Sequence, residues 1–456
     1  MEEMYMEPAR AIPVHDSCDV LVVGGGTACV IAAIASARTG AKTILIEQNG
    51  YLGGTIHGGV CGVHSFYNNY QYYNREPVQL VRGIPQEIVS RMQERGGCFG
   101  HVKTVRGYQQ FDTVTVIDRE MFKEVSLEMT EEAGVKLLLY TVFCETIMEN
   151  DVPVGVIIQS KNGREVIRAK RIVDTSGDAD AAASCGCGII PQDRPYNVGR
   201  VFAMANVDIP KLAAYLEELG VMENLAYVDE EQKSDRYLRI ATSFMMNPQM
   251  KAWANDLNLW GIYTFSLHEG ELTYFNGPKA APLKDFSPEE YTRADIETMK
   301  IITNTVRVCK EKFPGFEKAY VSWIAPQIGV RRTRTVHCEH MLTSADVESG
   351  ARFEDEIGLY GYHDMAPRRT INGGAWYGIP YRALIPVGVD NILVAGRMIT
   401  AEHDAHMSTR NSASCMLQGQ AAGTAAALSV LENVSPRNLD AGKLREKLRG
   451  DGVYLG

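Results

Sequence analysis

Polar side chains that could perform chemistry gather late in the sequence, in a short segment containing His403, Asp404, His406 and Arg410. Imidazole groups exchange protons near neutral pH, and a guanidinium group binds carboxylates or stabilises an oxyanion. We therefore expect His403, His406 and Arg410 to be catalytic residues. A hydrogen-bonded structural role for the two histidines is the alternative.

A second polar cluster contains Arg331, Arg332 and Arg334, followed by the sequence His-Cys-Glu-His at 337–340. The arginines are suited to recognising an anion, although a salt-bridged structural cluster is the stronger interpretation. The order His-Cys-Glu-His differs from the His-Glu-x-x-His zinc pattern, so we predict no metal site. The sequence also has no Gly-x-Ser-x-Gly nucleophile motif and no Walker phosphate loop.

A fold must position these groups, and its clearest signal lies near the start of the chain. An apolar run at Val20–Val23 ends in three glycines at 24–26, and the alanine-rich segment Thr27–Arg38 follows. A second apolar run, Thr43–Ile46, ends in Glu47. The order of strand, tight turn, helix and strand predicts a βαβ unit.

This unit has the features of a dinucleotide site. Its glycines fill the first two positions of Gly-x-Gly-x-x-Gly, and Cys29 fills the third, where a small residue lets helix and strand pack closely. The helix N-terminus is expected to face a pyrophosphate, and Glu47 to accept hydrogen bonds from ribose hydroxyls. These features alone do not distinguish FAD from NAD. The expected cofactor-binding residues here are Gly24, Gly26, Thr27, Ala28, Glu47 and Gln48.

The rest of the chain predicts a cofactor fold interrupted by a second domain. β-rich segments between Val135 and Val173 indicate a small antiparallel meander inserted into a parallel fold. The segment from Pro191 to about Pro326 is rich in aromatic residues and has no glycine-rich phosphate loop. We interpret that segment as a substrate or cap domain.

After this segment the cofactor fold is expected to resume, with strands at Ala383–Ile385 and Asn391–Ala395 and a helix at Ser412–Leu431. The predicted fold class is α/β: a Rossmann-type domain with an inserted antiparallel β-meander and a second α+β domain. The predicted domain boundaries are 1–190, 191–326 and 327–456.

Composition narrows the functional classes. The chain has 456 residues and a formal net charge of −10, which argues against nucleic acid and anionic membranes as partners and favours a small-molecule substrate. We find no signal peptide and no apolar run long enough to span a bilayer. With 10 cysteines and no disulfide pattern, the chain is expected to be cytoplasmic. A homo-oligomer is plausible from frequency alone.

Several longer blocks go beyond the glycine motif. They read DVLVVGGGTACVIAAIASARTGAKTILIEQNGYLGGT, RIVDTSGDADAAASCG, PQIGVRRTRTV, GIPYRALIPVGVDNILVAGRMIT and LQGQAAGTAAAL. Together they resemble the FAD-dependent oxidoreductase family related to the fumarate reductase and succinate dehydrogenase flavoproteins. The resemblance implies that the cofactor is FAD.

The resemblance also implies further residues near the cofactor. A second glycine pair is expected beside the flavin phosphates, and the helix around Gly419 to Ala427 is expected to stabilise negative charge on the reduced flavin. In related flavoproteins the loop after the second glycine pair passes close to the flavin, so His57, with His64 nearby, is a candidate base or covalent tether. The further cofactor-binding residues are Gly53, Gly54, Thr55, Gly177, Asp178, Gly396, Arg397, Gly419, Gln420 and Ala421.

The expected function is hydride transfer between a small polar organic substrate and flavin, most simply as a dehydrogenase whose flavin is reoxidised by a separate electron acceptor. One alternative is a reductase of an activated C=C bond that is supplied by an electron donor, with Arg410 or Arg382 as the proton donor. Another alternative is a non-catalytic flavin-binding redox subunit. The sequence shows no second Rossmann fold for a nicotinamide cofactor.

Overall fold

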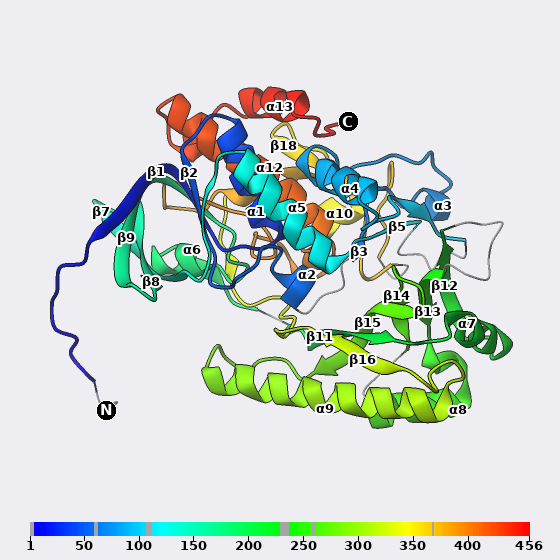
Figure 1. Cartoon of the computed structure of the whole chain (residues 1–456). Helices are drawn as coiled ribbons and strands as arrows, with labels where there is room; N and C mark the ends of the chain where they lie inside the picture. Colours follow the sequence, from blue (N-terminus) through cyan, green and yellow to red (C-terminus); the bar gives the residue numbers. More distant parts are fainter. Residues whose placement is uncertain are drawn as a thin grey trace.

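The computed structural model describes residues 4–58, 63–105, 112–192, 194–228, 237–257, 261–366 and 369–456. Figure 1 shows the main architecture: one sheet is covered by helices α1, α5 and α12, and a second sheet lies beside the long helix α9. These helices run Thr27–Arg38 (α1), Arg119–Glu132 (α5), Ser412–Leu431 (α12) and Pro288–Lys312 (α9).

The first sheet has a parallel core. Its strands β6 (Lys136–Leu138), β2 (Thr43–Ile46), β1 (Val14–Val23) and β9 (Gly163–Asp174) pair in that order, and β20 (Ile392–Val394) pairs with β9. All of these pairings are parallel, so the carboxyl ends of the strands meet at one edge. Ligands of open α/β sheets bind at such an edge, where the loops after the strands converge.

An antiparallel meander extends this sheet. Strand β8 (Val152–Ser160) pairs with β9, and β7 (Val142–Glu149) pairs with β8, both in antiparallel register. Ser160 pairs with Gly163, which closes a tight hairpin. The α/β fold with an inserted meander is therefore confirmed.

Helices α1 and α12 pack against each other at glycine positions. A Cβ atom added at Gly419 would overlap the backbone of Ala28, and one added at Gly423 would overlap the backbone of Ala32. Both helices are almost entirely buried, which explains why they contain small residues throughout rather than an amphipathic stripe. The late helix is thus joined to the first βαβ unit by close backbone contact.

The second sheet is antiparallel. Its order is β12 (Met222–Tyr227), β13 (Tyr237–Thr242), β14 (Tyr263–Phe265), β15 (Glu271–Ala280), β11 (Val198–Ala205) and β16 (Tyr320–Ile324). Helices α7 (Ile209–Glu218), α8 (Pro248–Leu257) and α9 belong to the same part of the chain. Phe265, Tyr274 and Phe275 are buried, so these aromatic residues of the expected cap form core.

Shorter elements make up much of the rest of the described chain. Other strands are β3 (Val63–His64), β4 (Val102–Lys103), β5 (Thr113–Val116), β10 (Ile189–Ile190), β17 (Thr335–Val336), β18 (Glu356–Tyr360) and β19 (Tyr377–Pro380). Other helices are α2 (Thr55–Gly58), α3 (Tyr70–Tyr73), α4 (Ile84–Glu94), α6 (Asp180–Ser184), α10 (Ser344–Ser349), α11 (His403–Thr409) and α13 (Ala441–Gly450), with 3-10 helices at Phe244–Met246, Tyr381–Leu384 and Pro436–Asn438.

Several predicted bounds agree with the structure, and one predicted strand is wrong. The helices at Thr27–Arg38 and Ser412–Leu431 begin and end where the sequence placed them. The segment Ala383–Ile385, predicted as a strand, lies mainly in the 3-10 helix Tyr381–Leu384. Its apolar side chains are buried, as they would also be in a strand. Hydrophobicity over so short a run therefore does not distinguish a strand from a 3-10 helix.

Candidate cofactor and substrate site

Loops from the carboxyl edge of the parallel sheet surround a cavity of about 620 Å³. Its walls come from the glycine turn, the end of β2, the loop after β9, the loop after β20, the start of α12, and two segments of the second domain. The lining residues include Gly25, Gly26, Thr27, Ala28, Glu47, Gln48, Asn49, Gly54, Thr55, Thr175, Ser176, Gly177, Asp178, Tyr291, Thr292, Asp295, Gln327, Ile328, Arg331, Gly396, Arg397, Arg410, Asn411, Ser412 and Cys415.

The N-terminus of α1 opens into this cavity. Its N-cap, Gly26, makes no side-chain capping bond, and the first turn contains no acidic residue. Within the described ranges, no atom other than those of Gly26 and its two chain neighbours lies within 4 Å of an ideal Cβ built at Gly26. The unpaired N–H groups and the positive end of the helix therefore face open space that suits the phosphates of a dinucleotide.

The neighbouring glycines are required by close contacts. Gly24 has a φ of +101°, and a Cβ there would lie 2.8 Å from Cα of Ser176. A Cβ at Gly54 would lie 2.8 Å from Cα of Gly26. Gly53 donates its N–H to the carbonyl of Gly25 at 2.8 Å. Gly24 and Gly53 thus shape the turns without lining the cavity themselves.

Glu47 stands at the end of β2, inside the cavity wall. Its side chain accepts hydrogen bonds from the backbone N–H and the amide of Asn49, both at 2.6 Å. Burial raises the pKa of Glu47, and the bonds from Asn49 oppose that rise. The carboxylate also fills the space that a Cβ at Gly25 would need. Glu47 is therefore an acceptor held at the position expected for a ribose contact.

The loop after β9 is organised by a buried carboxylate. Asp174 accepts hydrogen bonds from the N–H and the hydroxyl of Ser176 at 3.0 and 2.7 Å and from the N–H of Ala182 at 2.8 Å. Burial raises the pKa of Asp174 to about 6. These bonds fix the path of Gly177 and Asp178 along the cavity.

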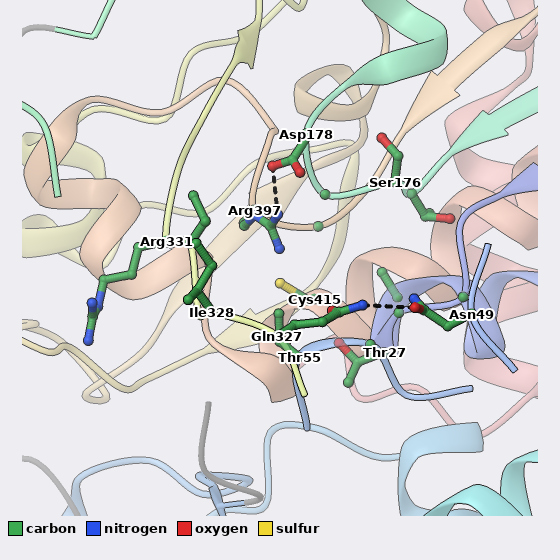
Figure 2. Close-up of a pocket in the computed structure, with 18 of the residues that line it drawn as sticks. Thr27, Asn49, Thr55, Ser176, Asp178, Gln327, Ile328, Arg331, Arg397 and Cys415 are labelled. Atoms are coloured by element: carbon green, nitrogen blue, oxygen red, sulfur yellow. Dashed lines mark hydrogen bonds and ion pairs between the residues drawn. The ribbon is translucent and has the colours of Figure 1, made fainter. Parts of the chain in front are cut away.

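Arg397 follows β20 and closes over this loop. Its guanidinium pairs with Asp178 at 2.6 Å, and a Cβ at Gly177 would lie 2.8 Å from the Arg397 Cζ atom. Figure 2 shows this pair on one side of the cavity and the hydrogen bond from Gln327 to Asn49 on another. The Nε atom of Arg397 is buried and has no partner among the described residues. An aromatic, hydrogen-bonding ligand with a diphosphate fits this set of groups.

Arg410 also lines the cavity. It is the C-cap residue of α11 and forms an ion pair with Asp364. Tyr362 donates its hydroxyl to the same carboxylate at 2.6 Å. The Arg410 guanidinium also lies 5.9 Å from the ring centre of Tyr196. Arg410 is thus held at the cavity by partners from two separate segments.

His403 and His406 lie behind Arg410 and are absent from the cavity lining. The Nε2 atom of His406 is 2.7 Å from the carbonyl of Arg397, and its Nδ1 atom is 3.0 Å from the hydroxyl of Tyr196. Burial and the nearby Arg332 and Arg410 lower the pKa of His406 well below its usual value. The imidazole is therefore neutral, donates from Nε2 to the carbonyl, and accepts from Tyr196 at Nδ1.

His403 has a different environment. Its ring stacks on Tyr196 with centroids 4.7 Å apart, and its Nδ1 atom is 3.0 Å from Asp404. The hydrogen bond from His403, followed by one from Arg369, lowers the pKa of Asp404. The pair His403–Asp404 is an imidazole oriented by an ionised carboxylate, which is an arrangement used for proton transfer.

The remaining candidates take other positions. Gly419, Gln420 and Ala421 lie in the middle of α12 and pack inside the protein, whereas the end of α12 that faces the cavity is formed by Asn411 and Ser412. This difference arises because the turn at 419–421 is needed for contact with α1.

His57 belongs to α2 and His64 to β3, but the side chains of both lie outside the described part of the structure.

The three arginines at 331–334 separate into different roles. Arg332 is buried and donates to the hydroxyl of Thr335 and to the carbonyl of Ala401. Arg334 pairs with Asp180 at 3.0 Å. Arg331 lines the cavity, and in the view of Figure 2 it lies on the side away from Asn49. Arg382 is exposed, pairs with the partly buried Asp355 and is absent from the lining.

Sequence reasoning missed several residues of the site. Asn49 and Gln327 bridge two walls by a hydrogen bond of 2.9 Å. Tyr196 and Asp364 organise the polar end, and α9 contributes lining residues from the second domain. Asn49 follows the predicted Glu47 closely enough to have been found. The others carry no local motif and are brought together only by the fold.

The parallel sheet, the open helix N-terminus and the polar cavity define a Rossmann-type dinucleotide-binding oxidoreductase. The match to the model of the "FAD dependent oxidoreductase" family covers residues 19–448. The chain belongs to that family and is an FAD-dependent oxidoreductase enzyme, with FAD as its cofactor.

Individual relatives are more distant. Dihydrolipoyl dehydrogenase of Trypanosoma brucei brucei is 29% identical over 94 residues, covering 19% of this chain and 20% of that protein. Digeranylgeranylglycerophospholipid reductase 1 of Methanococcoides burtonii is 22% identical over 218 residues, covering 44% of this chain and 48% of that protein. The matched regions therefore span half or less of these relatives.

A solved structure extends the comparison to most of the chain. The geranylgeranyl bacteriochlorophyll reductase-like protein of Thermoplasma acidophilum superposes with a TM-score of 0.51 and 15% identity, covering 95% of this chain and 83% of that chain. This likeness shows a shared fold. Neither a helix suited to crossing a membrane nor a metal-holding group of three or more His, Cys, Asp or Glu residues occurs within the described ranges.

Proposed function

We propose that this enzyme is a dehydrogenase that transfers a hydride from a small polar organic substrate to FAD, which is then reoxidised by a separate electron acceptor. The observation that carries the proposal is a single cavity whose lining runs from the open N-terminus of α1 to Arg410. Cofactor and substrate would therefore share one cavity. When bound there, FAD supplies the hydride-accepting group.

The protein's own residues would bind the cofactor and orient the substrate. Gly26, Thr27 and Ala28 would hold the diphosphate at the helix N-terminus, and Glu47 would bind the ribose. The start of α12 would direct its positive end toward the flavin. Arg410 would orient the substrate. The cofactor role of Gly396, Arg397 and the other predicted residues belongs to the same proposal.

His403 and His406 are both proposed as positioning residues, because neither lines the cavity. Asp404 orients the Nδ1 atom of His403, whose ring stacks on Tyr196. His406 contacts both Arg397 and Tyr196. Its Nε2 proton is engaged by the Arg397 carbonyl, and the surrounding cations oppose its protonation. Arg397 and Tyr196 are thereby held in place relative to each other.

Reduction of an activated C=C bond is the second candidate. One of the relatives described above is named as a reductase, and Arg410 lines the cavity where a proton donor would be needed. The kinship with the fumarate reductase and succinate dehydrogenase flavoproteins rests on the sequence blocks alone. Cytoplasmic location and a homo-oligomer likewise stay predictions.

Anaerobic flavin spectroscopy separates the two candidates. The oxidised holoenzyme is mixed with alcohols and hydroxy acids, and the dithionite-reduced holoenzyme with activated alkenes. A dehydrogenase predicts bleaching in the first experiment and slow or no reoxidation in the second. The opposite pattern would replace the dehydrogenase proposal by the reductase.

A further inference from the structure

Two cysteines flank a glycine at the end of the short helix α6. The helix ends with Cys185 as its C-cap, and Gly186 follows with a φ of +81°, a left-handed conformation that favours glycine. The N–H groups of Gly186 and Cys187 bond to carbonyls of the last helical turn at 3.1 and 3.0 Å. These two bonds form the Schellman motif, which ends many helices. The motif reverses the chain and brings the two cysteine side chains together.

The two sulfur atoms of this turn lie 3.6 Å apart, in direct contact. Cys185 and Cys187 are 7% and 5% exposed, whereas their neighbours Ser184, Gly186 and Gly188 are all exposed. The thiols therefore lie directly beneath an exposed stretch of backbone, where a small molecule in solvent can approach them.

The contact makes the two thiols unequal. A hydrogen bond from the S–H group of Cys187 lowers the pKa of Cys185, and the backbone N–H of Cys187 adds to this effect, although burial opposes it. The same side-chain hydrogen bond, followed by burial, raises the pKa of Cys187. Because the thiolate is the form that attacks a disulfide, we expect Cys185 to react first. Cys187 is then in place to attack the sulfur of Cys185.

The cysteine turn is connected to the cofactor cavity through α6. Asp174 accepts the N–H of Ala182 in this helix at 2.8 Å, and the same carboxylate fixes the loop after β9 that lines the cavity. Beyond the turn, the carbonyl of Gly188 accepts the N–H of His337 at 2.7 Å, where β10 pairs with β17. A disulfide bond is shorter than the present sulfur contact, so its formation must move a turn that is held at both ends. The movement reaches Asp174 through a helix of 5 residues.

We propose that Cys185 and Cys187 form a reversible thiol–disulfide pair that is oxidised by small-molecule disulfides, and that the enzyme holds FAD more weakly when this pair is oxidised. The thiolate of Cys185 attacks one sulfur of the external disulfide, forms a mixed disulfide and releases one thiol. Cys187 then loses its proton and attacks the sulfur of Cys185, which releases the second thiol. Two electrons pass from the protein sulfurs to the external disulfide, and the two protons end on the released thiols. The inference goes beyond the proposed function and holds for either direction of the flavin reaction.

Thiol mapping tests the chemistry. The FAD-loaded enzyme is equilibrated with mixtures of oxidised and reduced glutathione, quenched with acid, alkylated and analysed by peptide mass spectrometry. We expect Cys185 and Cys187 to lose their alkyl labels together as the mixture becomes more oxidising. A glutathione adduct should accumulate on Cys185 in the variant Cys187→Ser, whereas Cys187 should keep its label in the variant Cys185→Ser. Cys144→Ser is the matched control, because it removes an exposed thiol of β7 and should leave the behaviour of the pair unchanged.

Two results of the mapping would overturn the proposal. One is a parent enzyme in which Cys185 and Cys187 stay alkylated in the most oxidising mixture while the exposed Cys144 forms a glutathione adduct. The other is a disulfide between Cys187 and Cys338. Burial raises the pKa of Cys338 to about 12, so we do not expect this thiol to compete for Cys187.

FAD release tests the link between the cysteine turn and the cavity. The oxidised and the reduced enzyme are diluted, and free FAD is measured by its fluorescence at equilibrium. We expect the oxidised enzyme to bind FAD roughly threefold to tenfold more weakly, which is the effect of losing one hydrogen bond around Asp174. The FAD affinity of Cys185→Ser should be the same in all glutathione mixtures, which separates the thiol pair from any direct effect on the flavin. Equal affinities of the oxidised and the reduced parent enzyme would overturn the link.

Discussion

The two ends of the cavity are built in different ways. At the cofactor end, the cavity wall is formed mainly by the backbone of the turn at 24–26, of the second glycine pair and of the N-terminus of α1. At several of these glycines, neighbouring atoms leave no room for a side chain. At the other end, charged side chains from distant segments line the cavity, including Arg331 and Arg410. Substitutions should therefore act by steric exclusion at one end and by loss of charge at the other.

The largest effect is expected at Gly26, where a side chain would enter the cofactor's space without touching the protein. Gly26→Glu places a carboxylate beside the diphosphate. Two unit charges about 4 Å apart at an effective dielectric constant of about 20 repel by about 4 kcal/mol, or roughly 1000-fold in FAD affinity. Fluorescence titration of the apoprotein with FAD measures the loss, and its melting temperature should be unchanged.

Gly26→Gln is the control that has similar bulk and no charge. It should bind FAD more tightly than Gly26→Glu and less tightly than the parent protein. A Gly26→Glu protein that is fully loaded with FAD would contradict the placement of the diphosphate.

Substitution of a second glycine, Gly419, should lower the stability of the fold. Gly419→Ala adds a methyl group that overlaps the backbone of Ala28, so the helices α1 and α12 must separate. Overpacking of this kind costs about 1–3 kcal/mol of unfolding free energy. Urea unfolding of the apoprotein measures it. Gly450→Ala, at a helical glycine with no atom within 4 Å of the added Cβ, should be nearly neutral. Equal midpoints for the two variants would refute the close contact.

Substitution of Glu47 tests the contribution of a side chain to FAD binding at the cofactor end of the cavity. Glu47→Gln removes the negative charge that would accept hydrogen bonds from the ribose, and a charged hydrogen bond contributes about 1.5–2 kcal/mol. We expect FAD affinity to fall by roughly tenfold to thirtyfold. The same titration measures it, with Glu87→Gln on the protein surface as the control. Unchanged affinity would place the ribose elsewhere.

The sequence predicts the cofactor end of the cavity better than the other end, for a physical reason. The turn at 24–26, α1, β2 and Glu47 are close in sequence, so spacing and periodicity reveal them together. Tyr196 and Asp364 carry no local motif and are linked to His406 and Arg410 only across long stretches of chain.

The bounds of helix α12 are predicted correctly from the sequence, but its orientation toward the cavity is not. Its bounds, Ser412–Leu431, follow from composition, but which turn meets the cavity depends on how it packs. Gly419 contacts α1, which leaves Asn411 and Ser412 at the cavity. The presence of a glycine indicates that another segment can approach closely. It does not indicate which segment approaches.

The most direct test of the account is the visible spectrum of the purified protein before and after acid precipitation. FAD held in the cavity predicts flavin absorbance bands in the native protein, and release of FAD into the supernatant in a ratio of about one per chain. Colour retained in the pellet would mean a covalent flavin and would direct attention to His57. A colourless protein that fails to take up added FAD would contradict the central claim.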